Sequence, residues 1–226
     1  MVVEQSFNEI GDAAAALADD LESVLRGAID ARGGAILAVS GGRTPAAVFE
    51  RLAPRDIDWS RVTVTLTDER WVPEAHPDSN AGLVRRHLLQ GKAAAARFVP
   101  LYGGEAGPEA GQAACNSRLG ELPLPIDATY LGMGDDGHFA SLFPGEAAVD
   151  ARDGICVAVP ATAGRSGRMS LTAPTLLGSR SIYLLFNGEA KHRCYRQAKQ
   201  PGSARELPIR LLFDLPSGKL KVLHAP

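Results

Sequence analysis

The chain has 226 residues, of which 45% are hydrophobic and 22% are charged, and its formal net charge is −2 at pH 7. A chain of this length buries enough apolar surface to fold without disulfide bonds, and its nearly balanced charge excludes the broad basic field of a nucleic-acid-binding protein. No segment reaches the roughly 20 apolar residues of a membrane span or has the pattern of a signal peptide. We therefore expect a cytoplasmic protein with neither a nucleic-acid nor a membrane partner.

The N-terminal part of the sequence predicts a helix, a strand and a second helix. Apolar residues recur every three or four positions over residues 7–25, as on one face of a helix, and a later pair of glycines ends it. The run AILAVS at 35–40 is short and almost wholly apolar, which is typical of a strand buried on both faces. Thr44, followed by proline, is the expected N-cap of a helix that continues through Leu52.

The same alternation continues to the end of the chain. We expect strands over 62–67, 126–132, 155–160, 181–186 and 219–224, an extended piece over 94–101, and helices over 79–89 (with Ser79 as cap), 105–119 and 188–199. Strands that alternate with helices predict an α/β fold with a mainly parallel sheet covered by helices on both faces. Because no repeat, linker or break in composition interrupts the pattern, we expect one domain over residues 1–226.

The cysteines give no sign of a metal or a disulfide framework. Cys115, Cys156 and Cys194 are odd in number and widely spaced, without the Cys-x-x-Cys or Cys/His spacing of a zinc site. We expect them to be reduced and partly buried, and we expect no bound metal.

Three polar, glycine-containing segments follow predicted strands: SGGRTP at 40–45, TDERWVPEAHPDSN at 67–80 and LGMGDDGHFASLFPG at 131–145. In parallel α/β sheets, ligands bind at the carboxyl ends of the strands, near the point where the strand order reverses. The sequence therefore predicts one composite site built from these segments.

The first segment has the features of an anion-binding turn. Gly41 and Gly42 allow backbone N–H groups to approach a ligand, and the following helix start supplies unpaired donors. No Gly-Lys-Ser/Thr follows, so a nucleotide triphosphate is disfavoured. A tight strand-to-helix turn with no ligand fits this segment equally well.

Charged residues mark two further places. Asp-Glu-Arg at 68–70 directly follows a strand, where three charges either pair on the surface or point into a cleft. Arg165, Arg168 and Lys191 offer the guanidinium and ammonium donors that bind phosphate. Each of these three is also compatible with ordinary exposed charge.

His138 lies in the third segment, with Asp136 close enough in sequence to orient its ring. Histidine titrates near neutral pH, as a general base must; the alternative is a structural histidine. The same segment contains a Gly-x-Gly-x-x-Gly pattern, but Pro144 and Gly145 would end the helix that a dinucleotide site requires, so nicotinamide binding is disfavoured.

The chain lacks the motifs of several common hydrolases. There is no Gly-x-Ser-x-Gly nucleophile elbow, no His-Glu-x-x-His and no cysteine beside a base. A covalent hydrolase or a zinc hydrolase is therefore hard to assemble from this sequence.

Taken together, these segments resemble the 6-phosphogluconolactonase family, within the larger group that includes glucosamine-6-phosphate deaminases. The motifs occur in the same order along most of the chain: VSGGRTP (39–45), TLTDERWVP (65–73) with DSN (78–80), GMGDDGHFASLFP (132–144), RMSLT (168–172) and NGEAK (187–191).

The resemblance implies a single Rossmann-like domain, no cofactor, and hydrolysis of 6-phospho-D-glucono-1,5-lactone in the oxidative branch of the pentose phosphate pathway. We expect a monomer whose partner is this small-molecule substrate. It implies that His138 is the general base, that Asp136 is its neighbour, and that Asp68 and Arg70 face the sugar. It also implies a set of phosphate-binding residues: Ser40, Gly41, Gly42, Thr44, Lys191 and Arg168, with Arg165 as the alternative or additional arginine.

Two other functions remain open on the sequence. One is a glucosamine-6-phosphate deaminase; in that group the motif continues with a glutamate five residues after the histidine, where this chain has Phe143. The other is a non-catalytic sensor of sugar phosphates that keeps the fold but has no activity.

Overall fold

The computed structural model describes residues 2–226, without the side chain of Arg43. Its centre is a seven-stranded sheet in the order β1-β10-β9-β6-β2-β3-β5, in which every neighbouring pair is parallel. The bounds of these strands are β1 Val3–Ser6, β2 Ala35–Val39, β3 Val62–Leu66, β5 Arg97–Val99, β6 Ala128–Leu131, β9 Ser181–Asn187 and β10 Leu220–Ala225. The predicted mainly parallel α/β architecture is confirmed.

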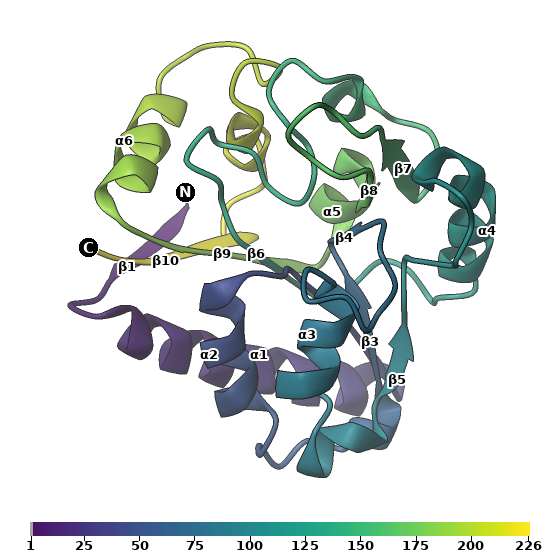
Figure 1. Ribbon diagram of the computed structural model, residues 1–226. Helices are drawn as coiled ribbons and strands as arrows, with labels where there is room; N and C mark the ends of the chain where they lie inside the picture. Colours follow the sequence, from purple (N-terminus) through teal and green to yellow (C-terminus); the bar gives the residue numbers. More distant parts are fainter. Residues whose placement is uncertain (1) are drawn as a thin grey trace.

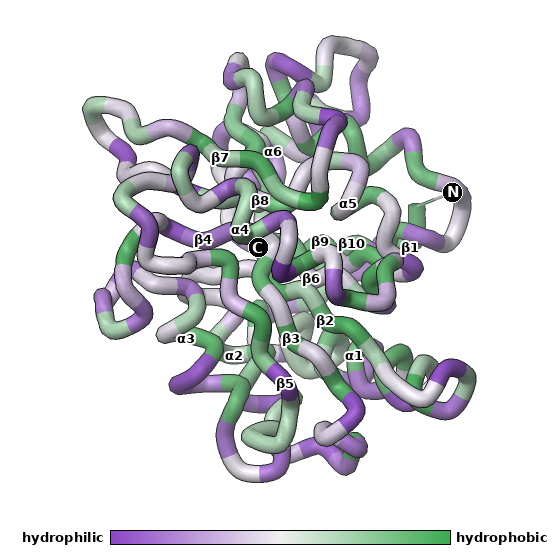
Figure 2. Tube along the Cα trace, turned by 90° about the vertical axis from the view of Figure 1, so that its right-hand side faces the viewer, coloured by the Kyte–Doolittle hydropathy of each residue, from purple (hydrophilic) through white to green (hydrophobic). Residues whose placement is uncertain are grey.

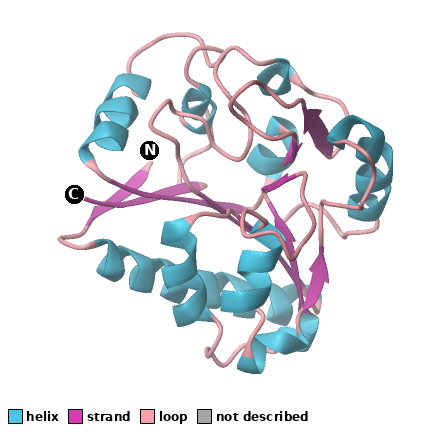
Figure 3. Cartoon of the chain, in the orientation of Figure 1, coloured by secondary structure: helices cyan, strands magenta, loops and turns pink. Residues whose placement is uncertain are grey.

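Helices cover both faces of the sheet, with α1, α2 and α3 on one side and α5 and α6 on the other (Figures 1 and 3). Their bounds are α1 Ile10–Arg32, α2 Arg43–Leu52, α3 Asn80–His87, α4 Pro108–Gly120, α5 Ala173–Gly178 and α6 Glu189–Ala198. The strand order runs outward in opposite directions from β2 and β6, so the order reverses between these two strands. Loops at such a reversal diverge and leave a crevice at the strand ends.

The core explains why these segments form these elements. All five residues of β2 are buried, as the continuous apolar run predicts, and one face of α1 presents Leu17, Leu21 and Leu25 with no exposed surface. Burying each such side chain contributes about 1.5–3 kcal/mol relative to leaving it exposed. Figure 2 shows the consequence: the central strands are hydrophobic, and hydrophilic residues gather in the outer loops.

A second, three-stranded antiparallel sheet lies over one end of the first, in the order β4-β8-β7. Its strands are β4 Asp68–Arg70, β7 Cys156–Val159 and β8 Arg168–Leu171. The strand expected at 155–160 is present as β7, but it belongs to this sheet and not to the parallel one. The expectation missed β4 and β8, because strands of three or four residues with charged ends give too short a pattern to recognise.

Two predicted boundaries are wrong. Thr44 is not the N-cap of α2: the helix already begins at Arg43 and its N-cap is Gly42, whose φ of 118° lies in the region that favours glycine. The extended piece at 94–101 is reduced to β5, because residues Gly91–Ala95 form a 3-10 helix. The cap expected at Ser79 is confirmed, since its Oγ accepts a hydrogen bond of 3.1 Å from the backbone N–H of Gly82.

Over residues 2–226 we find no helix that combines the length and the apolar character needed to cross a membrane. No three His, Cys, Asp or Glu side chains in this range come together as metal ligands would. Cys115, Cys156 and Cys194 are buried, more fully than expected, and none of them forms a disulfide bond within the described residues.

Candidate active site

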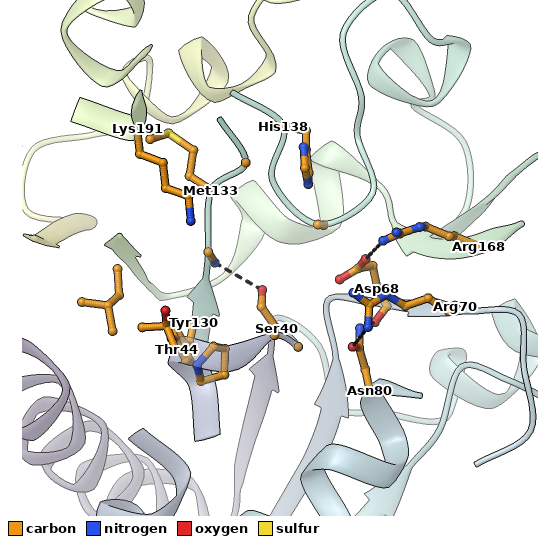
Figure 4. Close-up of a pocket in the computed structure, with 17 residues that line it drawn as sticks. Ser40, Thr44, Asp68, Arg70, Asn80, Tyr130, Met133, His138, Arg168 and Lys191 are labelled. Carbon is orange, nitrogen blue, oxygen red and sulfur yellow. Dashed lines mark hydrogen bonds and ion pairs between the residues drawn. The ribbon is translucent and has the colours of Figure 1, made fainter. Parts of the chain in front are cut away.

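A cleft opens at the carboxyl ends of β2 and β6, where the strand order reverses. It is lined by nine of the eleven candidate residues, which the sequence distributes over five separate segments: Ser40, Gly41, Gly42, Thr44, Asp68, Arg70, His138, Arg168 and Lys191. Asp136 lies directly behind His138, and Arg165 lies outside the cleft. Figure 4 shows His138 at the top of the cleft, Lys191 and Thr44 on one side, and Asp68, Arg70 and Arg168 on the other.

The glycine turn forms one wall together with the start of α2. Ser40 directly follows β2. Its Oγ shares a hydrogen bond of 2.8 Å with Thr67 Oγ1 and accepts one of 3.4 Å from the backbone N–H of Gly132. Gly42 caps α2 without a side-chain hydrogen bond, so the first N–H groups of that helix remain free to meet an anion. Lys191, in the first turn of α6, lines the same cleft.

His138 is oriented by Asp136. Its Nδ1 lies 2.6 Å from Asp136 Oδ1, and its backbone N–H donates to the same oxygen at 3.1 Å. The hydrogen bond with His138 lowers the pKa of Asp136 from its ordinary value of 3.8, against the opposing effect of burial. Because Nδ1 is engaged, Nε2 is the ring nitrogen left to exchange a proton with a ligand.

The glycines of this loop make room for the ring and do not form a dinucleotide site. A Cβ on Gly134 would lie 2.2 Å from the Nδ1 and Cε1 atoms of His138. No crossover helix follows Gly137; the next helical element within the described chain is the short 3-10 helix Ala147–Asp150. The sequence-based rejection of a nicotinamide site therefore agrees with the local geometry.

The opposite wall is a network centred on the carboxylate of Asp68, which is only 5% exposed. Its Oδ2 accepts a hydrogen bond from Ser141 Oγ at 2.6 Å and lies 3.5 Å from Arg168 Nη1, and its Oδ1 accepts from Thr67 Oγ1 at 3.3 Å. Burial lowers the pKa of Arg168, while the charge of Asp68 opposes this effect. With both oxygens engaged, Asp68 acts to hold Arg168 in place.

Arg70 is held in the same wall by Asn80. Its Nη1 donates to Asn80 Oδ1 and to the carbonyl oxygen of Asp78, both at 2.8 Å. Asn80 in turn donates through Nδ2 to the carbonyl oxygen of Asp68 at 2.8 Å. Sequence reasoning did not single out Asn80 or Ser141, although each lies in a quoted motif: Asn80 in DSN (78–80) and Ser141 in GMGDDGHFASLFP (132–144).

Arg165 does not line the cleft and binds other residues. Its Nη2 pairs with Glu146 at 2.7 Å, and its guanidinium carbon lies 3.8 Å from the centre of the Phe143 ring. Phe143 also contacts His138, since the centroids of their rings are 4.5 Å apart. Of the two candidate arginines, Arg168 is the one in the cleft.

Comparison with known proteins gives a consistent family. Residues 9–221 match the model of the family described as glucosamine-6-phosphate isomerases/6-phosphogluconolactonase. The chain is 43% identical over 217 residues to a 6-phosphogluconolactonase from Pseudomonas aeruginosa, covering 94% of this chain and 91% of that protein, and 40% identical to one from Neisseria meningitidis over the full length of both.

The structural comparison agrees. A crystal structure of a 6-phosphogluconolactonase from Shewanella baltica superposes with a TM-score of 0.96 at 39% identity, covering 100% of this chain and 98% of the other. The match in sequence, in fold and in the order of the motifs has one explanation. The chain belongs to the glucosamine-6-phosphate isomerase/6-phosphogluconolactonase family.

Proposed function

We propose that the protein hydrolyses 6-phospho-D-glucono-1,5-lactone to 6-phosphogluconate, and that His138 activates the attacking water. The observation that carries this proposal is that the His138 ring, with its Nδ1 bound to Asp136, faces the same cleft as the glycine turn and Lys191. The curated relatives at 40–43% identity are 6-phosphogluconolactonases, which supports the same substrate.

In this proposal the substrate phosphate binds on the side of the cleft that carries the glycine turn. The free N–H groups at the start of α2 donate to the phosphate, Thr44 and Ser40 add hydroxyl groups, and Lys191 supplies the positive charge. Arg168 lies on the facing wall beside Asp68, so its guanidinium reaches the ligand from the opposite direction (Figure 4).

The chemistry is one hydrolysis that passes through a tetrahedral intermediate. Nε2 of His138 takes a proton from water as the water oxygen bonds to the lactone carbonyl carbon, a type of assistance that contributes about 10²–10⁴-fold. Arg70 lines the cleft, and its guanidinium supplies the donor for the oxyanion that forms. The bond from the carbonyl carbon to the ring oxygen then breaks, and the proton passes to that oxygen.

The deaminase alternative lacks a carboxylate where its motif requires one. Phe143 takes that position; it is 8% exposed and packs against His138, so the position offers no acid or base for opening a sugar ring. A non-catalytic sensor would bind 6-phosphogluconate, seen as a thermal shift, and leave the spontaneous rate of lactone opening unchanged.

The test is a pH-stat assay of purified protein on freshly prepared lactone. We expect His138→Ala to lower kcat at least about tenfold with little change in KM, and Lys191→Ala or Arg168→Ala to raise KM. His76→Ala is the matched control, because this histidine is exposed and lies outside the cleft. Unchanged turnover in His138→Ala would remove it from the base role, and release of ammonia from glucosamine 6-phosphate would favour the deaminase.

A further inference from the structure

Glu69 is fully buried, yet the chemistry proposed above does not use it. Successive side chains of a strand point to opposite faces, so Asp68 and Arg70 of β4 line the cleft while Glu69, between them, points away towards α3. A buried carboxylate is costly unless hydrogen bonds satisfy it. The groups that surround the Glu69 carboxylate must therefore offset the cost of burying it.

The Glu69 carboxylate receives four hydrogen bonds. Oε1 accepts from the backbone N–H groups of Arg70 and Asn80, both at 2.8 Å. Oε2 accepts from the backbone N–H of Ala81 at 2.7 Å and from Ser79 Oγ at 3.1 Å. The carboxylate thus satisfies the first two N–H groups of α3 and ties that helix to the strand that carries Arg70.

Helix α3 already has an N-cap, because Ser79 Oγ accepts a hydrogen bond from the backbone N–H of Gly82. What Glu69 adds is the position of Asn80 relative to Arg70. Asn80 Oδ1 holds Arg70 Nη1, and the Asn80 amide fills the space where Gly41 has no side chain. The buried carboxylate of Glu69 therefore sets the position of Arg70 relative to the glycine turn.

We infer that Glu69 is a positioning residue, which places the Arg70 guanidinium in the cleft by anchoring the start of α3 and, through it, Asn80. The inference rests on the proposed function for its kinetic consequence, because Arg70 contributes to oxyanion stabilisation in that reaction. Glu69 itself touches no substrate.

The kinetic test is a double-mutant cycle on the full-length protein. Glu69→Gln keeps the shape of the side chain but offers one acceptor oxygen, so its NH₂ group opposes the N–H donors that the carboxylate accepted. We expect kcat to fall about tenfold or more with KM changed less than about threefold. In an Arg70→Ala background, Glu69→Gln should change kcat less than about twofold, because the residue through which it acts is gone.

Ser79→Ala is the control: it removes the cap on Gly82 and one of the four donors to Glu69, but it leaves the three backbone N–H groups bound to the carboxylate. It should lower the melting temperature and leave kcat within about twofold of the unmodified protein. If Glu69→Gln fails to fold, Glu69→Asp, which keeps the charge but is too short to hold every donor, replaces it in the cycle. An equal loss of kcat in both Arg70 backgrounds, or an equal loss in Ser79→Ala, would overturn the inference.

A second readout does not depend on any activity. Hydrogen-bonded guanidinium groups rotate slowly and give resolved Nη–H signals in ¹H–¹⁵N spectra, so the Arg70 signals should be lost in Glu69→Gln and retained in Ser79→Ala. If the unmodified protein proves inactive on the lactone, the proposed function fails, and these spectra still decide the positioning role. Unchanged Arg70 signals in Glu69→Gln would refute it.

Discussion

Replacing Gly41 by alanine tests how the two walls of the cleft fit together. A Cβ built on Gly41 would lie 1.8 Å from Oδ1, 2.2 Å from Cγ and 2.8 Å from Nδ2 of Asn80, distances that no packed structure tolerates. Asn80 is 2% exposed, and its amide cannot shift without breaking its hydrogen bonds to Arg70 and to the Asp68 carbonyl. The added methyl group must therefore displace the Asn80 amide.

The magnitude follows from the hydrogen bonds that this displacement breaks. The bond from Asn80 Nδ2 to the Asp68 carbonyl is neutral, worth about 0.5–1.5 kcal/mol, and the bond from Arg70 to Asn80 Oδ1 is charge-assisted, worth about 1.5–3 kcal/mol. Because Arg70 is only half-buried, we take the lower part of the sum, about 2–3 kcal/mol. For a chain of this length, such a loss lowers the melting temperature by roughly 4–12 °C.

The assay is thermal unfolding together with kcat/KM on the lactone. Gly41→Ala should lower both, and in an Asn80→Ala background the same change should alter the free energy of unfolding by no more than about 0.5 kcal/mol, because the obstructing amide is absent. Gly27→Ala in α1 is the control, since its Cβ meets nothing within 4 Å and alanine favours a helix by about 0.5–1 kcal/mol. Equal destabilisation by Gly41→Ala in both backgrounds would refute the steric argument.

Three further outcomes follow from the same structure. Since its bond to His138 lowers the pKa of Asp136, the stability that this carboxylate contributes is present above its ordinary pKa of 3.8 and is lost as the pH falls through the lower folded value. The melting temperature of Asp136→Asn should therefore lie below that of the unmodified protein at pH 7, and the gap should narrow as the pH falls below 3.8; a gap that does not narrow with falling pH contradicts this. Arg165→Ala should change KM less than about twofold, because the guanidinium pairs with Glu146 outside the cleft, and a rise like that of Lys191→Ala would place it on the phosphate. The protein should elute as a 23.8 kDa monomer and unfold in one cooperative transition, as expected of one domain; two resolved transitions would show two.

The parallel sheet was predictable because its strands are encoded locally. Runs such as residues 35–39 are apolar throughout, and the polar segments that follow them meet at one edge of the sheet by the geometry of parallel strands. Seven of the nine candidate residues in the cleft lie in these segments, and only the resemblance joined Arg168 and Lys191 to them. Their roles in binding and catalysis stay predictions.

What the sequence did not indicate depends on contacts between distant segments. The sequence around Ser141 does not indicate that its hydroxyl binds Asp68, 73 positions earlier. In the same way, the sequence around Glu69 does not indicate that its carboxylate binds the start of α3. The assignment of Thr44 as a cap failed because residue type favours threonine there, whereas the positive φ of Gly42 decides where α2 begins. Arg165 and Arg168 are the same residue type three positions apart, and the carboxylate with which each one pairs separates them: Glu146 for Arg165 and Asp68 for Arg168.

The cleft has walls of independent origin: the turn after β2, the His138 loop and Lys191 belong to the parallel sheet, while Arg70 and Arg168 belong to the small antiparallel one. The β7–β8 hairpin that supports Arg168 turns through residues 160–167, at the surface and away from the main sheet. We expect changes of length in that turn to act on the wall that carries Arg168 and to leave the glycine turn in place. Under the proposed function, the antiparallel sheet is therefore the part of the fold to vary in order to change which phosphorylated lactones are accepted.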